Sequence, residues 1–210
     1  MSDKNLTIIE HPLMQHMLGE LRNKETDSFN FRRLVNEAGR FLAYEATKNY
    51  QLSSKQIETP MTKTEVGCIE ETPVVVSIMR AGNGMLDGIL AMLPFASAGH
   101  IGIYRDKFIN NTVEYYFKLP EDVKGREILL ADPMLASGDT AVACVDRLKK
   151  YDVGKIKLLS ILTSKPGVEK LHHFHPDVDI FCIGHDSELN EKAYIIPGLG
   201  DAGDRLYQTK

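Results

Sequence analysis

The stretch EILLADPMLASGDT, residues 127–140, decides the fold. Its first five residues form a short apolar run that predicts a strand, and residues 140–150 beyond it have the apolar spacing of a helix. Between them, residues 137–139 (SGD) are small or polar, as in a tight turn. A strand that passes through a short turn straight into a helix is the repeating unit of an α/β sheet.

The same alternation continues on both sides of this stretch. Short apolar runs predict further strands, and helical patterns at residues 85–93 and 168–173 fall between several of them. These runs are PVVVSIM (73–79), HIGIY (100–104), IKLLSIL (156–162) and VDIFCI (178–183). Because they are continuously apolar, they are typical of parallel strands covered on both faces. The pattern therefore predicts a doubly wound α/β fold, an open, mainly parallel sheet with helices on both faces.

Other segments add to this sheet. Residues 31–49 predict a helix with Asn30 as its N-cap, and the mixed segment 51–71 suits short strands or loops. Residues 111–119 indicate an antiparallel strand or hairpin arm, a kind of element that often serves a subunit interface. The sequence shows no repeat or long linker, so we expect one domain over residues 1–210.

Composition excludes several classes of protein. The net charge of -4 and the pI of about 6.0 argue against a nucleic-acid-coating surface. The sequence has no stretch near the ~18 apolar residues of a membrane helix, and its start lacks the pattern of a secretory signal. Cys68, Cys144 and Cys182 are widely spaced and odd in number, as expected for unpaired thiols. We expect a cytoplasmic protein without a membrane or nucleic-acid partner.

The turn at residues 132–140 is the strongest candidate for a binding site. In an open α/β sheet, ligands bind beyond the carboxyl ends of the strands. Asp132 can there reach ribose hydroxyls or a metal-bound water, while Ser137, Gly138, Asp139 and Thr140 offer donors at a helix N-terminus, which attracts anions. An ordinary capped strand-turn-helix explains the same residues without a ligand.

Two further strand ends carry an arginine. Arg80 lies in the glycine-rich loop 79–84, and Arg105 follows the run at 100–104. Glycines allow the backbone to approach a ligand closely, and the planar guanidinium suits phosphate oxygens. A solvated arginine in a turn is the alternative in both places.

The tail at residues 193–205 is rich in glycine but also apolar, AYIIPGLGDAGDR. Such a composition predicts an ordered loop folded around something small and flat, or a packed loop without a ligand. His172, His173 and His175 lie close together before Pro176, and we interpret them as a solvated surface cluster because no further ligand spacing accompanies them.

Together these segments resemble the uracil phosphoribosyltransferase family over essentially the whole chain. DPMLASGDTA (132–141) resembles the family's loop for phosphoribosyl diphosphate (PRPP), and YIIPGLGDAGDR (194–205) resembles its uracil loop. MRAG (79–82) is similar to its pyrophosphate loop, and YRD (104–106) also matches. Pro133 stands where other phosphoribosyltransferases have a second acid, which favours the uracil branch. Asp139 departs from the glycine usual at its position, and its carboxylate would be unfavourable beside a phosphate unless it turned outward.

The resemblance implies an enzyme of pyrimidine salvage that converts uracil and PRPP to UMP and diphosphate. It implies Mg²⁺ bound through PRPP, a homo-oligomer, and GTP as a candidate allosteric activator, although the sequence has no separable GTP motif. The implied catalytic residues are Arg80, Arg105 and Asp201. The implied PRPP-binding residues are Arg80, Arg105, Asp132, Pro133, Met134, Leu135, Ala136, Ser137, Gly138, Asp139, Thr140 and Asp201, and the uracil-binding residues are Ile195, Gly200, Asp201 and Ala202.

Two alternatives belong beside this interpretation. A PRPP- or nucleotide-sensing regulator that binds RNA would use the same fold but would need a basic face and salt-sensitive affinity. A phosphoribosyltransferase for another base, such as xanthine or adenine, would differ only in the base pocket.

Overall fold

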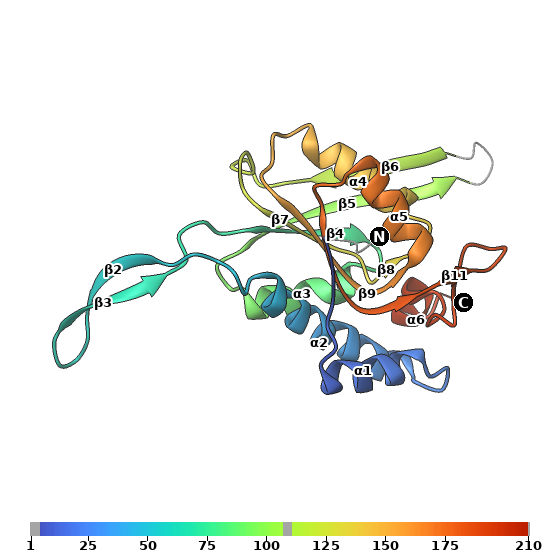
Figure 1. Cartoon of the computed structure of the whole chain (residues 1–210), viewed down its shortest axis with the longest axis horizontal. Coiled ribbons are helices and arrows are strands. Elements are labelled where there is room, and N and C mark those ends of the chain that lie inside the picture. Colours follow the sequence, from blue (N-terminus) through green and yellow to red (C-terminus); the bar gives the residue numbers. More distant parts are fainter. Residues whose placement is uncertain (1–4, 107–110, 210) are drawn as a thin grey trace.

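A computed structural model describes residues 5–106 and 111–209, with the backbone alone for residues 105, 106, 111 and 112. The predicted strands form one sheet in the order β1-β10-β9-β7-β4-β5-β6, with the short β8 beside β9. Every pairing is parallel except that of β6 with β5, so the predicted open, mainly parallel sheet is confirmed (Figure 1). The strands are β1 (Leu6–Ile8), β4 (Val74–Met79), β5 (Ser97–Asp106), β6 (Asn111–Lys118), β7 (Ile128–Ala131), β8 (Met134–Leu135), β9 (Ile156–Ser164) and β10 (Asp179–Asp186).

Helices cover both faces of this sheet, as predicted. The helices are α1 (Pro12–Arg22), α2 (Ser28–Ala46), α3 (Asn83–Met92), α4 (Asp139–Lys149), α5 (Lys165–Phe174) and α6 (Ala202–Tyr207). Val75 of β4 belongs to the apolar cluster of α1, α2, α3 and α6, whereas Val74 and Val76 belong to the cluster of α4 and α5. Because successive side chains of a strand point to opposite faces, the continuous apolar run of β4 fills two cores.

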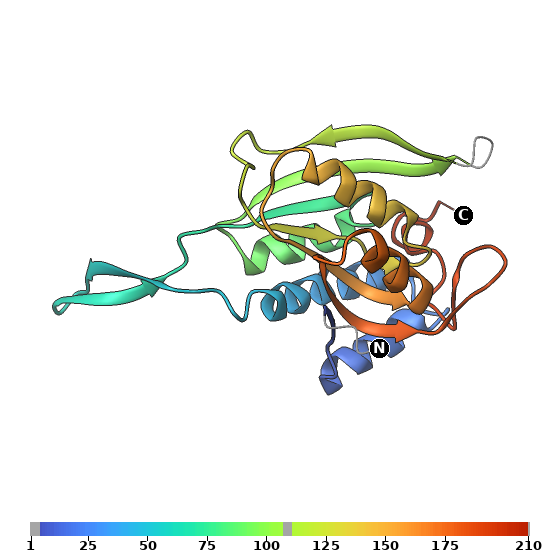
Figure 2. The same cartoon turned by 45° about the horizontal axis from the view of Figure 1, so that its top comes forward.

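The segment after α2 forms a hairpin that leaves the body of the protein. Its strands, β2 (Ser53–Glu58) and β3 (Lys63–Cys68), pair antiparallel with each other, and Figures 1 and 2 both show the hairpin extending away from the sheet. A second small antiparallel pair, β11 (Glu188–Leu189) with β12 (Ile195–Ile196), follows β10. The segment 51–71 thus contains strands, one of the two forms that its composition allows.

Three boundary predictions were wrong, each for a local reason. Asn30 is not the N-cap of α2, because the side chain of Asp27 accepts the Asn30 amide at 2.8 Å and the helix begins at Ser28. Arg105 does not follow its strand, because the pairing of β5 with β6 continues to Asp106. The tail is not all loop, since it ends in α6.

Within the described part of the chain, no helix is long and apolar enough to cross a bilayer.

Candidate active site

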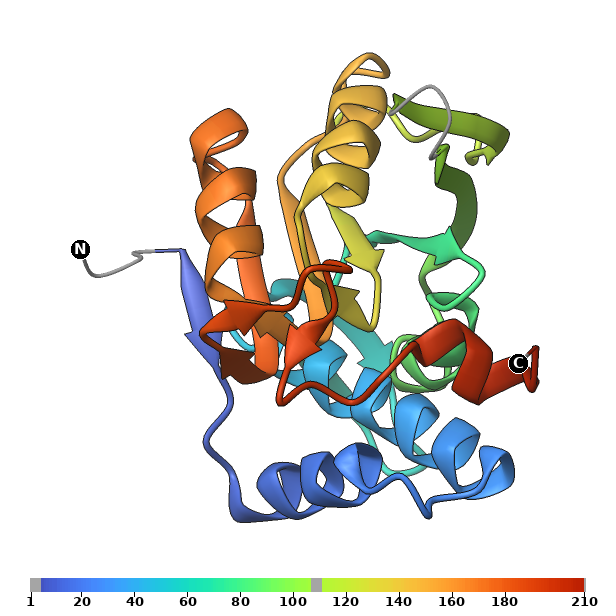
Figure 3. The ribbon, with the colours of Figure 1, turned by 90° about the vertical axis from the view of Figure 1, so that its right-hand side faces the viewer.

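The segments singled out in the sequence meet at one edge of the sheet. The parallel strands β4, β7, β9 and β10 end there at Met79, Ala131, Ser164 and Asp186. Figure 3 looks onto this edge, with the tail (red) crossing in front of the strand ends. The 79–84 loop links the other two segments, because a Cβ on Gly82 would lie 2.4 Å from the carbonyl oxygen of Ala131, while the Tyr207 hydroxyl donates to the Arg80 carbonyl at 3.1 Å.

The 132–140 turn is built from backbone contacts that fix its shape. Gly138, the N-cap of α4, has a φ of 84°, which an L side chain rarely adopts. The Ser164 hydroxyl donates to the Ala136 carbonyl at 2.6 Å and accepts from the Gly167 amide at 3.0 Å. The N-cap and first turn of α5 therefore pack against the 132–140 turn at Ala136 and Gly138.

The first residues of this turn belong to the sheet rather than to the open loop. Met134 and Leu135 form β8 beside β9, and the Pro133 carbonyl accepts the Ile161 amide at 3.0 Å. The Leu135 side chain is buried in the core. Of the predicted PRPP-binding residues in this turn, those that lie beyond β8 are therefore Ala136, Ser137, Gly138, Asp139 and Thr140.

Asp132 lies half-buried directly after β7. Burial raises the pKa of its carboxyl group to about 7, and the Met134 amide, 3.4 Å from Oδ1, opposes this only weakly. A nearby cation or hydroxyl donors would stabilise the charged form of this carboxyl group and lower its pKa.

Asp139 resolves the conflict noted in the sequence, because its carboxylate has partners inside the protein. The Ser137 hydroxyl donates to Oδ2 at 2.8 Å, and Oδ1 forms an ion pair with Lys170 of α5. No local signal in the sequence indicated Lys170, which lies in the middle of a different helix.

The Arg80 side chain reaches from the end of β4 toward the tail. The Met79–Arg80 peptide bond is cis. The side chain is 55% exposed, and its guanidinium lies 3.8 Å from the Asp204 carboxylate of α6. The Arg105 side chain lies outside the described residues, and only its backbone in β5 is placed.

The predicted uracil residues occupy the tail. Ile195 is buried in β12, and Ala202 is buried at the start of α6. Gly200 has a φ of 82° and open space where a side chain would stand, apart from a contact with Arg205. The Asp201 side chain caps α6 by accepting the Asp204 amide at 2.9 Å. The tail thus exposes backbone at Gly200 beside a short helix.

Arg22 and Asp186, which the sequence did not single out, hold the tail against the sheet. The Arg22 guanidinium donates twice to the Asp186 carboxylate, both at 2.7 Å, and once to the Gly198 carbonyl at 2.8 Å. The Gly198 amide in turn donates to Asp186 at 3.0 Å. The clamp formed by Arg22, Asp186 and Gly198 thus joins α1, β10 and the tail.

Arg205 provides a second anchor for the tail. Its guanidinium donates to the Leu199 carbonyl at 2.9 Å and to the Asn23 carbonyl at 2.7 Å, and it lies 4.2 Å from the centre of the Phe31 ring. Desolvation lowers the pKa of Arg205 from its usual value. Three carbonyl or aromatic partners from separate segments therefore fix the end of the tail.

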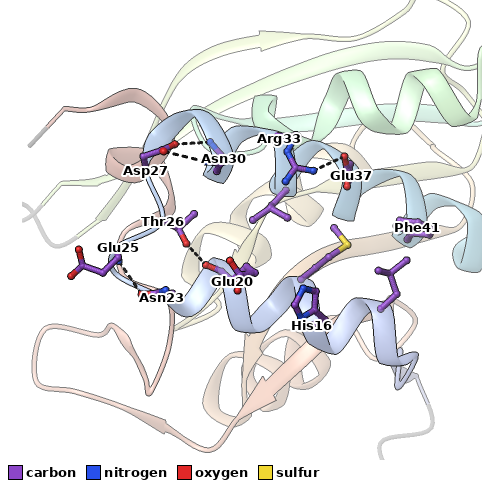
Figure 4. A pocket seen from close by; sticks show the side chains of 13 residues that line it. His16, Glu20, Asn23, Glu25, Thr26, Asp27, Asn30, Arg33, Glu37 and Phe41 are labelled. Carbon is purple, nitrogen blue, oxygen red and sulfur yellow. Dashed lines mark hydrogen bonds and ion pairs between the residues drawn. The ribbon is translucent and has the colours of Figure 1, made fainter.

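A groove of about 580 Å³ opens elsewhere, between α1 and α2 (Figure 4). Several of its polar side chains have structural partners: Asp27 caps α2, the Thr26 hydroxyl donates to the Glu20 carbonyl, and Arg33 pairs with Glu37. None of the residues that line it belongs to the 79–84 loop, the 132–140 turn or the tail. The candidate active site is therefore the strand edge and not this groove.

The remaining candidate side chains have structural places. His175 is only 6% exposed, with Nε2 3.3 Å from Asp146, so the interpretation of a solvated histidine cluster was wrong for this residue. It is the C-cap of α5, and its backbone amide donates to the Leu171 carbonyl. Cys144 and Cys182 are buried and unpaired, and burial raises the pKa of the Cys182 thiol to about 11. Among the described residues, no three His, Cys, Asp or Glu side chains are grouped as metal ligands.

Comparison with known proteins gives one consistent family. The family model described as uracil phosphoribosyltransferase matches residues 8–209. A uracil phosphoribosyltransferase of Rhizobium leguminosarum is 48% identical over 206 residues, covering 98% of this chain and 99% of that protein. One from Legionella pneumophila is 46% identical over 211 residues and covers 100% and 99% of the two chains.

Solved structures agree at the level of the fold. The AQ2163 protein from Aquifex aeolicus superimposes with a TM-score of 0.93 at 34% identity, covering 98% of this chain and 99% of the other. A purine phosphoribosyltransferase from Pyrococcus horikoshii has a TM-score of 0.51 at 15% identity, with 73% and 83% covered, and shares the fold alone.

Proposed function

The chain belongs to the uracil phosphoribosyltransferase family, and from this premise we propose how its residues divide the work of the reaction. The enzyme transfers the ribose 5-phosphate of PRPP to uracil and releases diphosphate, which yields UMP in pyrimidine salvage. The assignments below rest on where each side chain lies at the strand edge.

The 5′-phosphate binds to the turn at residues 136–140. The left-handed Gly138 turns the chain so that α4 begins at this point, and the first amides of a helix have no partner within it. These donors and the helix dipole together favour an anion. The Thr140 hydroxyl adds a further donor, whereas the Ser137 hydroxyl already donates to Asp139.

Asp132 holds the ribose hydroxyls. Its half-buried carboxyl group has one weak backbone donor and a raised pKa, so hydroxyl donors or a nearby cation would stabilise its charged form. Mg²⁺ commonly binds through substrate phosphates and one or two carboxylates, and Asp132 fits the place beside such an ion. When bound to PRPP, the ion supplies positive charge that offsets the diphosphate.

Arg80 and Arg105 stabilise the departing diphosphate. Arg80 is exposed at the end of β4, and its guanidinium can exchange the 3.8 Å contact with Asp204 for phosphate oxygens, which it matches in a planar fork. Arg105 is assigned by its match to the family motif at residues 104–106. Arg80 directly follows β4, and Arg105 lies in β5, which pairs with β4 in the sheet.

Uracil binds along the tail. Ile195 provides apolar support, and main-chain groups at Gly200, Asp201 and Ala202 match the alternating acceptors and donor of the uracil edge. Gly200 leaves open space where a side chain would exclude a flat ring. Cytosine has a different pattern of donors, and a mismatched buried polar group costs about 1–3 kcal/mol.

The reaction itself follows from this arrangement. The bond between C1′ and the diphosphate oxygen breaks, leaving an oxocarbenium-like ribose. The bond from the uracil nitrogen to C1′ forms on the opposite face, and the proton of that nitrogen passes to the released diphosphate. The protein aligns the two reactants and stabilises the charge that leaves with the diphosphate. Asp201 has its side chain engaged as the cap of α6, so we assign it a positioning contribution to the base and PRPP.

One observation supports this proposal most strongly: the 79–84 loop touches both the end of β7 and α6, so the turn and the tail face one site. The test is UMP formation measured by chromatography from PRPP, Mg²⁺ and a panel of bases. We expect product with uracil and little with cytosine, xanthine or adenine. Equal product from a purine would contradict the assignment of the tail. The same assay with added GTP tests allosteric activation.

We also propose that the protein forms a homo-oligomer through the β2–β3 hairpin. An isolated two-stranded hairpin is only marginally stable in water. This one nevertheless exposes Leu52, Ile57 and Met61, the last of them 90% exposed at its tip. Sedimentation of the wild type and of M61D decides the matter: we expect a wild-type oligomer that the charged tip weakens, and a monomeric wild type would contradict the proposal.

A further inference from the structure

Asp139 brings a negative charge into the turn that the phosphate would occupy. It is the first residue of α4, directly after Gly138, and its side chain accepts from the Ser137 hydroxyl at 2.8 Å. Like charges repel, and the repulsion grows where protein excludes water. An unpaired carboxylate at this position would therefore oppose the binding of a 5′-phosphate.

Lys170 of α5 supplies the compensating charge, since its ammonium group forms an ion pair with the Asp139 carboxylate. Close backbone packing holds the two helix starts together: a Cβ on Gly138 would lie 3.0 Å from the Gly167 carbonyl oxygen and 3.2 Å from the Lys170 Cβ. This packing therefore fixes the position of the Lys170 backbone next to the turn.

The ion pair contributes little to the stability of the fold. The Lys170 and Asp139 side chains are 39% and 26% exposed. Pairs with this much solvent typically stabilise a protein by about 0–1 kcal/mol. A carboxylate in the first turn of a helix is already favoured by the helix dipole. The pair is therefore better explained by the charge of the turn than by folding.

We propose that Lys170 is a positioning residue for PRPP, which holds the Asp139 carboxylate and neutralises it so that the amides of the turn remain open to the 5′-phosphate. This inference rests on the proposed function of the turn. It adds a residue on α5 to a site otherwise built from the 132–140 turn, the 79–84 loop, Arg105 and the tail.

The test compares K170M with the wild type by steady-state kinetics and by calorimetric titration with ribose 5-phosphate. We expect the KM for PRPP and the Kd for ribose 5-phosphate to rise about tenfold, equivalent to about 1.4 kcal/mol, while kcat and the KM for uracil change less than about twofold. K170R should retain most of the affinity because it keeps the charge. K149M is the matched control, since Lys149 pairs with Asp177 at 2.7 Å at the far end of α4, and it should bind as the wild type does.

The double variant D139N/K170M distinguishes charge from structure. Removing both charges should recover most of the lost affinity, a result that a merely structural lysine would not give. The inference is overturned if K170M binds within about twofold of the wild type, or if D139N/K170M binds no better than K170M. If K170M does not fold, the affinity of D139N/K170M alone decides: near wild-type supports the inference, and tenfold weaker overturns it.

The proposed function is tested separately by wild-type turnover. A wild type that binds ribose 5-phosphate but makes no UMP would remove the proposed function, while the comparison of variants would still decide on Lys170. A wild type that does not bind ribose 5-phosphate would overturn both.

Discussion

Replacing Arg22 by methionine should loosen the tail and destabilise the protein. The change removes the double contact with Asp186 and the contact with the Gly198 carbonyl, and it leaves the Asp186 carboxylate, 9% exposed, with the Gly198 amide. Breaking a buried ion pair on one side costs about 3–5 kcal/mol. Because the Arg22 side chain is 25% exposed, water replaces part of what is lost, and we expect about 2–3 kcal/mol.

Thermal unfolding and uracil kinetics measure both effects. For a chain of this length, each kcal/mol lowers Tm by about 2–4 °C, so R22M should melt about 4–12 °C below the wild type. The KM for uracil should rise about tenfold, and more than the KM for PRPP, because the clamp holds the base-binding tail.

R33M is the matched control, since Arg33 pairs with Glu37 at 3.1 Å in the open, with side chains 52% and 40% exposed. It should cost less than about 0.5 kcal/mol. If R22M has the same Tm as R33M and keeps the wild-type KM for uracil, the clamp does not hold the tail and the reasoning is refuted.

Three further predictions concern the strand edge. Burial raises the pKa of the Asp132 carboxyl group from 3.8 to about 7, so the folded state binds its proton more tightly than the unfolded state, and the free energy of unfolding of the unliganded wild type should fall as pH rises from about 4 to 7. D132N should lose less stability over this range, by at most about 4 kcal/mol; urea unfolding at several pH values measures this, and an equal dependence on pH in both proteins would contradict the burial of the charge. G138A should weaken PRPP binding and cost about 1–3 kcal/mol, because φ is 84° and the new Cβ meets the Gly167 carbonyl, whereas G125A, with φ of 74° and open space, should strain the chain without changing the KM for PRPP. R105A should lower PRPP turnover by about a hundredfold or more with an unchanged circular dichroism spectrum, and near-normal kinetics would argue against its role.

The sequence predicted the sheet well because its signal is local. Continuous apolar runs such as that of β4 identify strands buried on both faces, and the turn after β7 shows its small residues directly. Helix α6 was missed because it is short and its Gly203 has low helix propensity, although Asp201 caps it and Leu206 is fully buried. Tertiary packing outweighs propensity there.

The supports of the site could not be predicted from one sequence, since they join distant segments. Arg22 lies 164 positions from Asp186, and Asp139 lies 31 positions from Lys170. Charged residues are common on any surface, and nothing local indicates which two will meet. The candidate binding segments are therefore readable in the sequence, whereas the contacts that hold them in place require the fold.

The most direct test of the account is a crystal structure with UMP bound. We expect phosphate oxygens within about 2.7–3.2 Å of the amides of residues 137–140, and we expect the uracil ring to contact the backbone of residues 200–202. A phosphate bound away from the N-terminus of α4, or a base that does not contact the tail, would contradict the claim that the two segments hold one nucleotide.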